Sequence, residues 1–457
     1  MDPNEEPAFN VVVRLCEVVE RPWGRIITPK QLGSRVEQIE RVLEHGIDYV
    51  DRQSGRHVHV DLSIANHEDE TTSFLYASHR VVINAEHEGL LRKDYPDLFD
   101  PIQERIGDTT ILTTINKEID ALTVVAQINA TNKTAIASVD HVFWTNQGGH
   151  VICREGDDPE PADRPDGPHR EDLDCGRGVR IAVIDNGIAT EALTDSWLDG
   201  ITVDTIDRDP LRTYTSQSSN PNDDPNWLDL AAGHGTFVTG IIRQVAPGAE
   251  IVTIRALDSD GVGLESQLAA AIDEAIAAGV QIINLSVGGY TDNDLAPVAI
   301  VQALSRVPRD VAVVAAAGNE AITRPLYPAA IPGVLGVAAL DLEGTNRDEF
   351  ASAELAAYTN KPPSGQEYVA TAGRWTSVFV SGVENPARDR PSDRFDGYAT
   401  GSGTSFSAAA MSGMIAVGLS RSAAGTSAND IVARITGAVA SRVPARDEIL
   451  HVDIWSL

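Results

Sequence analysis

From residue 179 onward, the chain alternates between short, continuously apolar runs and longer segments with helical spacing. The apolar runs predict strands at Val179–Ile184, Ile251–Ala256, Val280–Leu285, Val311–Ala317 and Val334–Ala339. Between them, apolar residues at helical spacing predict helices, most clearly at Glu265–Ala278 and Leu295–Val307. Continuous apolar strands separated by helices are typical of a parallel sheet covered by helices on both faces. We therefore expect an α/β fold here, with its chemistry at the carboxyl ends of the strands.

The N-terminal third of the chain carries mixed signals. Strand-like runs occur at Phe9–Leu15, His57–Leu62, Arg80–Asn84, Leu122–Ile128 and Ala135–Val139. A helix is predicted from Pro29 to about His45, and Pro29 suits its first turn because the missing N–H costs nothing there. Residues 154–174 are rich in Pro, Gly and charge, which predicts an exposed linker. The chain thus divides into a smaller α+β N-terminal domain (1–153), the linker, and a larger domain (175–457).

Composition and charge exclude several classes of protein. The 457-residue chain carries 67 Asp and Glu against 36 Lys and Arg, a formal net charge of −31. This charge repels phosphates, so we expect neither nucleic acid nor a membrane surface as a partner. No run approaches the roughly 20 apolar residues of a membrane span. Because Cys16, Cys153 and Cys175 do not suit a disulfide framework and the acidic start MDPNEEP does not resemble a secretory signal, we expect a cytoplasmic protein.

Four polar residues of the larger domain stand where strands end or helices begin. Asp185 ends the strand VRIAVID, and Asn319 follows the strand VAVVAAAG. His234 lies in GHGTFVTGII at an expected helix start, and Ser405 lies in GSGTSFSAAAM before a second helix. Each alone has a simpler explanation as a helix cap or a turn residue. All four nevertheless fall where an α/β sheet presents side chains to a cleft, which favours a shared site.

The order Asp185, His234, Ser405 is that of subtilisin and differs from the chymotrypsin and α/β-hydrolase orders. Residues from about 176 to 457 resemble a subtilisin-like serine peptidase (subtilase) catalytic domain. Other segments that match are ALDSDGVGLESQL (256–268), INLSVGG (283–289), YPAAIPGVLGVAALD (327–341) and EILHVDIWSL (448–457). The resemblance implies a subtilisin-like parallel sheet covered by helices on both faces and a serine endopeptidase acting on proteins or peptides. It does not reach the first 150 residues.

The resemblance also implies a role for each candidate residue. His234 would act as general base and then as general acid, Asp185 would orient its imidazole, and Ser405 would form an acyl-enzyme. The Asn319 side-chain amide and the Ser405 backbone N–H would stabilise the oxyanion, so the chemistry requires no cofactor. The peptide would bind as an added strand. Its two neighbours would be Leu285-Ser286-Val287-Gly288 and the Gly261–Gly263 region, and Ala315-Ala316-Ala317-Gly318 would wall the pocket for the residue before the cut. Small side chains in that wall favour a large apolar group, and the alternative is that Glu320 favours a basic one.

The sequence departs from the family pattern in places. Asn186 stands where Ser or Thr is usual, Phe237 replaces a His, and Ala409 replaces the Pro of the serine helix. None of these removes a reacting group, although the missing Pro could affect the position of Ser405. Within the stretch between Asp185 and His234, the segment from Asp199 to Asp229 carries seven Asp residues, at positions 199, 204, 207, 209, 223, 224 and 229. They suggest either a structural calcium site or a solvated acidic surface loop, and no EF-hand spacing is present.

Alternative functions remain open at this stage. The subtilase fold could be catalytically idle and serve as a protein-binding module. A nucleotide-binding doubly wound domain is disfavoured, because no Gly-x-Gly-x-x-Gly or P-loop follows the strand Val179–Ile184. The N-terminal domain could restrain the protease and respond to a regulatory protein, or it could be a folding aid or an independent partner-binding module.

Overall fold

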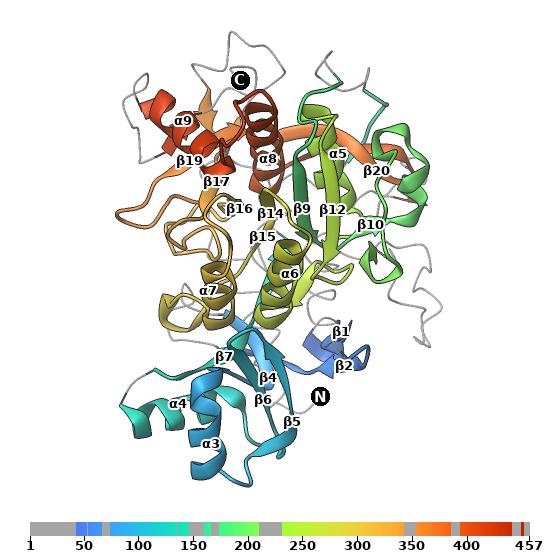
Figure 1. Ribbon diagram of the computed structural model, residues 1–457. Helices are drawn as coiled ribbons and strands as arrows, with labels where there is room; N and C mark the ends of the chain where they lie inside the picture. Colours follow the sequence, from blue (N-terminus) through green and yellow to red (C-terminus); the bar gives the residue numbers. More distant parts are fainter. Residues whose placement is uncertain are drawn as a thin grey trace.

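The computed structural model describes residues 43–52, 54–65, 74–133, 135–145, 160–165, 173–209, 231–341, 353–384, 394–440 and 449–451. Its larger part is built on a parallel sheet with the strand order β12-β9-β14-β16-β17-β19-β22 (Figure 1). These strands are β12 Glu250–Arg255, β9 Arg180–Asp185, β14 Ile282–Leu285, β16 Ala312–Ala316, β17 Leu335–Asp341, β19 Tyr368–Ala372 and β22 Ile449–His451. The short β18 (Glu354–Leu355) adds to β17 antiparallel. The predicted α/β fold with a parallel sheet is confirmed.

Helices cover both faces of this sheet. On one face lie α5 (His234–Val245), α8 (Thr404–Ser420) and α9 (Ala428–Ala440), and on the other lie α6 (Glu265–Ala277) and α7 (Val298–Ser305). Successive strand residues point to opposite faces, so Ile181 and Val183 pack on the α5–α8 side and Ala182 and Ile184 on the α6–α7 side. Both faces are therefore buried, which explains the continuous apolar runs.

The N-terminal part forms an antiparallel sheet with β4 (Phe74–Asn84) at its centre. Its other strands are β3 Leu62–Ala65, β5 Phe99–Ile106, β6 Thr109–Thr114 and β7 Ala137–Thr145. One face packs on α4 (Ala121–Asn132) and the other on α6 and α7, as Figure 1 shows. The remaining elements are the hairpin of β1 (Ile47–Val50) and β2 (His57–Val60), helix α3 (Glu88–Asp94) and the short helix η2 (Ala85–His87).

Strand β7 joins the two parts of the molecule. Beyond its pairing with β4, its last residues pair antiparallel with β13 (Val262–Leu264) on one side and β15 (Val287–Gly288) on the other. Both β13 and β15 belong to the larger part of the chain. The end of the N-terminal domain is therefore an added strand between two segments of the larger domain.

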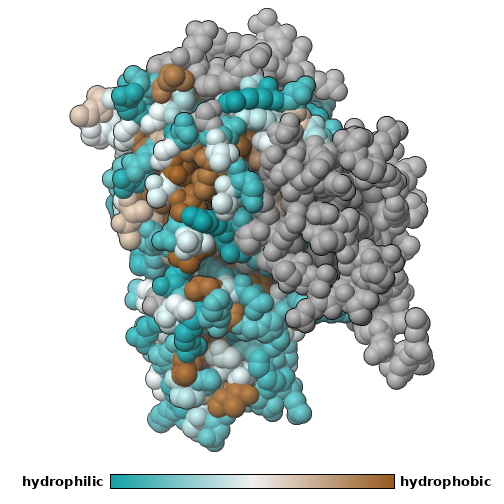
Figure 2. All heavy atoms as spheres, turned by 90° about the vertical axis from the view of Figure 1, so that its right-hand side faces the viewer, coloured by the Kyte–Doolittle hydropathy of each residue, from teal (hydrophilic) through white to brown (hydrophobic). Residues whose placement is uncertain are grey.

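The remaining described elements lie around the larger sheet. They are β10 Ile188–Ala189, β11 Arg208–Asp209, η3 Thr190–Thr194, η4 Ser196–Leu198, η5 Thr205–Asp207, η6 Asp292–Asp294, β20 Arg374–Glu384 and β21 Arg394–Ser402. On the face in Figure 2, hydrophobic side chains gather mainly in the upper part, which is the larger domain, and the N-terminal part below is mostly hydrophilic.

Two predictions about local structure are wrong. Leu122–Ile128 is not a strand, because it lies inside helix α4, where Ala121, Val124, Val125 and Ile128 form one buried face. The expected linker is not exposed throughout, because Glu160–Pro161 forms β8 and pairs with β21. Phe9–Leu15 and most of the predicted helix Pro29–His45 lie outside the described residues, of which Leu43–His45 are helical.

Candidate active site

Asp185 and His234 form a buried pair at the carboxyl end of the parallel sheet. Asp185 is the last residue of β9, and His234 is the first residue of α5. The imidazole Nδ1 lies 2.8 Å and 3.0 Å from the two carboxylate oxygens of Asp185. Because ionised Asp can only accept, Nδ1 carries the proton in this contact and Nε2 is left as the acceptor. This is the tautomer that a general base requires.

Asn186 holds these two elements together. Its side-chain oxygen accepts the backbone N–H of Gly235 at 2.9 Å, and its amide nitrogen donates to the Ala231 carbonyl at 2.6 Å. The Asn side chain thus bridges both sides of His234 from the end of β9. The departure from the usual Ser or Thr is therefore compatible with a tightly held His234.

Ser405 occupies the first turn of α8, which begins at Thr404. The helix runs without interruption through Ala409, so the missing Pro does not break it. Phe237 on α5 packs against Phe406 with ring centroids 4.4 Å apart, and Phe406 lies 5.9 Å from the His234 ring. The substituted Phe237 is thus a packing contact between the His-bearing and Ser-bearing helices.

The Ser405 hydroxyl donates to the Ser286 carbonyl at 3.4 Å. His234 Nε2 is buried and has no hydrogen-bond partner within the described parts of the chain. No hydrogen bond therefore joins Ser405 to His234 in the described residues, and catalytic hydrogen bonds are often long or unformed without substrate. A buried network also ties Ser405 to β14, because Ser286 Oγ donates to the Ser405 carbonyl at 3.0 Å and accepts from Asn284 at 3.0 Å.

Asn319 is fixed beside the Ser405 helix. Its side-chain oxygen accepts the Thr404 backbone N–H at 2.9 Å, and the Thr404 hydroxyl accepts the Gly318 N–H at 3.0 Å. This bond orients the side-chain amide of Asn319, whose nitrogen is its donor end. The structure thus brings Asn319, which follows β16, to the start of α8, where Ser405 lies.

The predicted peptide-binding segments are those on either side of β7. Thr145 N–H donates to Gly261 O at 2.9 Å, and Phe143 lies opposite Gly263. On the other side, Thr145 lies opposite Val287 and Trp144 opposite Gly288. Leu285 instead pairs within the parallel sheet, and Ser286 faces Ser405. The chain's own residues 142–145 thus have the strand arrangement expected for a peptide in this cleft.

The predicted pocket wall has a mixed orientation. Ala315 and Ala317 pack with the α6–α7 side of the sheet, and Ala316 packs with the α8 side. Gly318 has a φ of +102°, in the left-handed region that favours glycine, and leads into Asn319. Glu320 does not point freely into a pocket, because its carboxylate accepts hydrogen bonds from Tyr290 and Asn360.

The acidic stretch is only partly a solvated loop. Asp207 and Asp209 are buried, and Asp209 accepts the Gly233 N–H at 2.7 Å and the Ser259 hydroxyl at 2.5 Å. Asp209 therefore steadies the residue before His234, a role that sequence reasoning missed. Asp223, Asp224 and Asp229 lie outside the described residues. Over the ranges described, no cluster of three His, Cys, Asp or Glu side chains is arranged to hold a metal ion.

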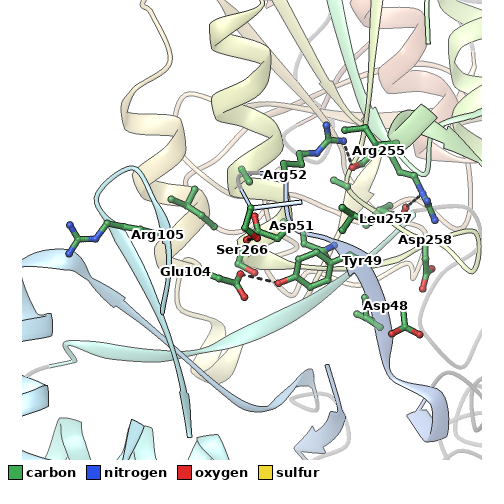
Figure 3. Close-up of a pocket in the computed structure, with 18 of the residues that line it drawn as sticks. Asp48, Tyr49, Asp51, Arg52, Glu104, Arg105, Arg255, Leu257, Asp258 and Ser266 are labelled. Atoms are coloured by element: carbon green, nitrogen blue, oxygen red, sulfur yellow. Dashed lines mark hydrogen bonds between the residues drawn. The ribbon is translucent and has the colours of Figure 1, made fainter. Parts of the chain in front are cut away.

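Arg52 on the N-terminal hairpin docks on the larger domain away from the triad. It donates to Asp207 at 2.5 Å, to Glu274 of α6 at 2.7 Å and to the Arg255 carbonyl at 2.7 Å. A cavity of about 580 Å³ opens beside it, lined by the hairpin, β5 and residues 255–258. Figure 3 shows Arg52 reaching toward Arg255 and Tyr49 bonded to Glu104 in the cavity wall. None of the four predicted catalytic residues lines it.

A second docking point is a buried ion-pair network at the start of α6. Asp140 of β7 accepts the N–H and hydroxyl of Ser266, and Arg80 bonds Asp140 at 2.8 Å and Glu104 at 2.8 Å. Burial alone would lower the pKa of Arg80, but Asp140, Tyr49 and Glu104 raise it well above its usual value. Burial would likewise raise the pKa of Glu104, but the charge and hydrogen bonds of Arg80 lower it.

Comparisons with known proteins agree with this fold. Residues 176–447 match the Subtilase family. The thermostable alkaline protease of Halalkalibacterium halodurans is 29% identical over 231 residues, which is 47% of this chain and 58% of that protein. The minor extracellular protease Epr of Bacillus subtilis is 30% identical over 240 residues, 50% of this chain and 30% of that protein. This chain therefore spans between about a third and three fifths of these two relatives.

A solved structure extends the similarity in fold. Fervidolysin from Fervidobacterium pennivorans, described as a keratinolytic enzyme related to subtilisin, superposes with a TM-score of 0.56 at 16% identity. The match covers 83% of this chain and 60% of that one. Because the family match covers more than half of the chain, the protein belongs to the subtilase family. None of the helices in the described ranges has the length and hydropathy of a membrane span.

Proposed function

We propose that this protein is a serine endopeptidase that hydrolyses peptide bonds through an acyl-enzyme. The observation that supports the proposal is the buried Asp185–His234 pair, with Nδ1 2.8 Å from the carboxylate, near the start of α8, where the ring of Phe406, next to Ser405, lies 5.9 Å from that of His234. His234 Nε2 takes the proton of the Ser405 hydroxyl as Oγ attacks the scissile carbonyl, and then gives it to the leaving amine. Water repeats the sequence on the acyl-enzyme and releases the second product.

The oxyanion that forms in each step is stabilised by preorganised donors. The Asn319 amide, held through its oxygen by the Thr404 N–H, supplies one donor, and the Ser405 backbone N–H supplies the other. The scheme uses protein groups and water alone and needs no cofactor.

We further propose that the N-terminal domain restrains the peptidase. The support is the position of Val142–Thr145, which pair with both β13 and β15 and so occupy the backbone sites that a substrate strand would use. Arg52 and Asp140 add contacts at α6, away from the triad. A regulatory protein that binds the N-terminal domain would release the cleft by favouring the undocked state.

The experiment that tests the peptidase proposal is mass spectrometry of a proteome-derived peptide library incubated with wild type and with Ser405→Ala. The proposal expects new termini with wild type only. Equal products from both proteins would contradict it and favour a catalytically idle binding module. The cytoplasmic location expected from the sequence stays a prediction, to be tested by fractionation, and the name of Epr indicates that this relative is extracellular.

A further inference from the structure

The turn that carries Asn319 is held by Asn360, which lies forty positions after Glu320 in the chain. Asn360 Oδ1 accepts the backbone N–H groups of Glu320 at 2.9 Å and Ile322 at 3.2 Å. Its backbone N–H donates to the Gly318 carbonyl at 3.0 Å. Asn360 is almost fully buried, so these bonds replace contacts that water would otherwise make. The side chain of Asn360 thus holds the backbone after Asn319, and its backbone N–H holds the residue before it.

The same residue also fixes the carboxylate of Glu320. Asn360 Nδ2 donates to Glu320 Oε2 at 2.6 Å, and the Tyr290 hydroxyl donates to the same oxygen at 3.1 Å. Burial, with the nearby charge of Glu320, raises the pKa of Tyr290 well above its usual range, so its hydroxyl stays a donor. That oxygen accepts a third bond, from the Asn319 backbone N–H at 3.0 Å.

The fit at this point leaves little room for movement. A Cβ on Gly318 would lie 2.2 Å from Asn360 Nδ2 and 2.7 Å from Glu320 Oε2. Neighbouring main-chain bonds join Ala321 to Tyr358 and Lys361 to Ile322, so the segment 358–361 lies along the whole turn. A small error in the position of an oxyanion donor lowers the rate strongly, because the donor must meet charge that develops only in the transition state.

We propose that Asn360 is a positioning residue that acts through Glu320 to hold Asn319 in the oxyanion hole, and that Glu320 therefore does not select basic substrates. This inference rests on the proposed peptidase function. A residue needed only for folding would affect the rate with or without the Asn319 amide. The proposed effect of Asn360 on kcat instead requires that amide.

The test measures hydrolysis of p-nitrophenyl acetate by the full-length chain, since this small ester needs none of the backbone sites that β7 fills. Removing an oxyanion donor costs about 10²–10³ in kcat, so Asn360→Ala should lower kcat about tenfold with little change in KM. In a protein that already carries Asn319→Ala, adding Asn360→Ala should cause no further loss of kcat. Glu320→Gln, which keeps an acceptor oxygen, should lower kcat less than Asn360→Ala does and leave the ratio of Lys to Phe peptide cleavage unchanged.

A matched control is Asn129→Ala. The side-chain oxygen of Asn129 likewise accepts hydrogen bonds from two backbone N–H groups, those of Ile136 and Ala137, far from the triad. Its loss should leave kcat unchanged. Unchanged kcat in Asn360→Ala, or an additive loss in the double variant, would overturn the inference while the peptidase proposal stands. A weaker preference for Lys substrates in Glu320→Gln would also overturn it. Hydrolysis by wild type no faster than by Ser405→Ala would contradict the peptidase proposal and this role together.

Discussion

Thr145 and Gly261 are in backbone contact across the two parts of the molecule. The Thr145 N–H donates to the Gly261 carbonyl at 2.9 Å, and a Cβ on Gly261 would lie 2.6 Å from Thr145 Oγ1. Gly261 also has a φ of +78°, which disfavours other residues. The close approach of β7 to this side of the cleft thus depends on the absence of a side chain at Gly261.

Breaking the contact between Thr145 and Gly261 should free the proposed peptide-binding segments from β7. Thr145→Pro removes the donating N–H and disturbs the added strand, whereas Thr145→Ala keeps the N–H. We expect the full-length Thr145→Pro protein to cleave a fluorogenic peptide several-fold faster than wild type, and Thr145→Ala to change the rate much less. Equal initial rates in all three proteins would contradict restraint by residues 142–145.

Arg52 should anchor the N-terminal hairpin to the larger domain at a point away from the cleft. Arg52→Ala removes the bonds to Asp207 and Glu274 and leaves the carboxylate of buried Asp207 with fewer partners. We expect faster amide hydrogen exchange over Ile47–Val60 and a higher peptidase rate. Arg105→Ala is the control, because the exposed Arg105 pairs with Glu88 inside the N-terminal domain. The same exchange pattern in both variants would argue against a specific anchor.

Asn186 should matter for both stability and rate. Asn186→Ala leaves the buried Gly235 N–H and Ala231 carbonyl without this partner, at a cost of about 1–3 kcal/mol in the free energy of unfolding. Because His234 lies between these residues, kcat should fall as well. Asn186→Asp keeps the acceptor for Gly235 but sets a carboxylate oxygen against the Ala231 carbonyl in a buried site, so it should not restore the lost stability. Denaturant unfolding and ester hydrolysis measure the two effects, and wild-type values for Asn186→Ala would exclude the bridging role.

Much of the larger domain could be predicted from sequence because its signals are local and agree with one another. The apolar runs become β9, β12, β14, β16 and β17 within one or two residues at most ends. The strand prediction for Leu122–Ile128 was wrong because its Val-Val-Ala core suits a strand. The signals for a helix were Asp120, which caps it, and the apolar residues that recur at helical spacing.

The positions of Asp209 and Asn360 could not be predicted in the same way. Asp209 contacts Gly233 across a stretch with no apolar pattern, and Asn360 reaches the Asn319 turn from a distant segment. Such contacts depend on tertiary placement, which no local spacing encodes. The pairing of β7 with β13 and β15 likewise joins segments more than a hundred residues apart.

Acid should weaken the Arg80 network. The pKa of Glu104 is lowered in the folded protein, so its ionised form stabilises the fold above its ordinary value of 4.5. This contribution is lost as the pH falls through the lower folded-state pKa. We expect the free energy of unfolding to drop on acidification below about pH 4.5, with a shallower drop in Glu104→Gln. Identical pH profiles for the two proteins would contradict a role for Glu104 in that loss.

The central claim is that Ser405 is a nucleophile activated by His234 and Asp185. Its most direct test is covalent labelling of the full-length protein by a small fluorophosphonate, followed by intact-mass and peptide mass spectrometry. We predict one equivalent of label on Ser405 in wild type, no label in Ser405→Ala, and labelling at least about a hundredfold slower in His234→Ala, since a triad acts as a unit. Absence of label in wild type, or equal labelling of the Ser405→Ala protein, would contradict the assignment.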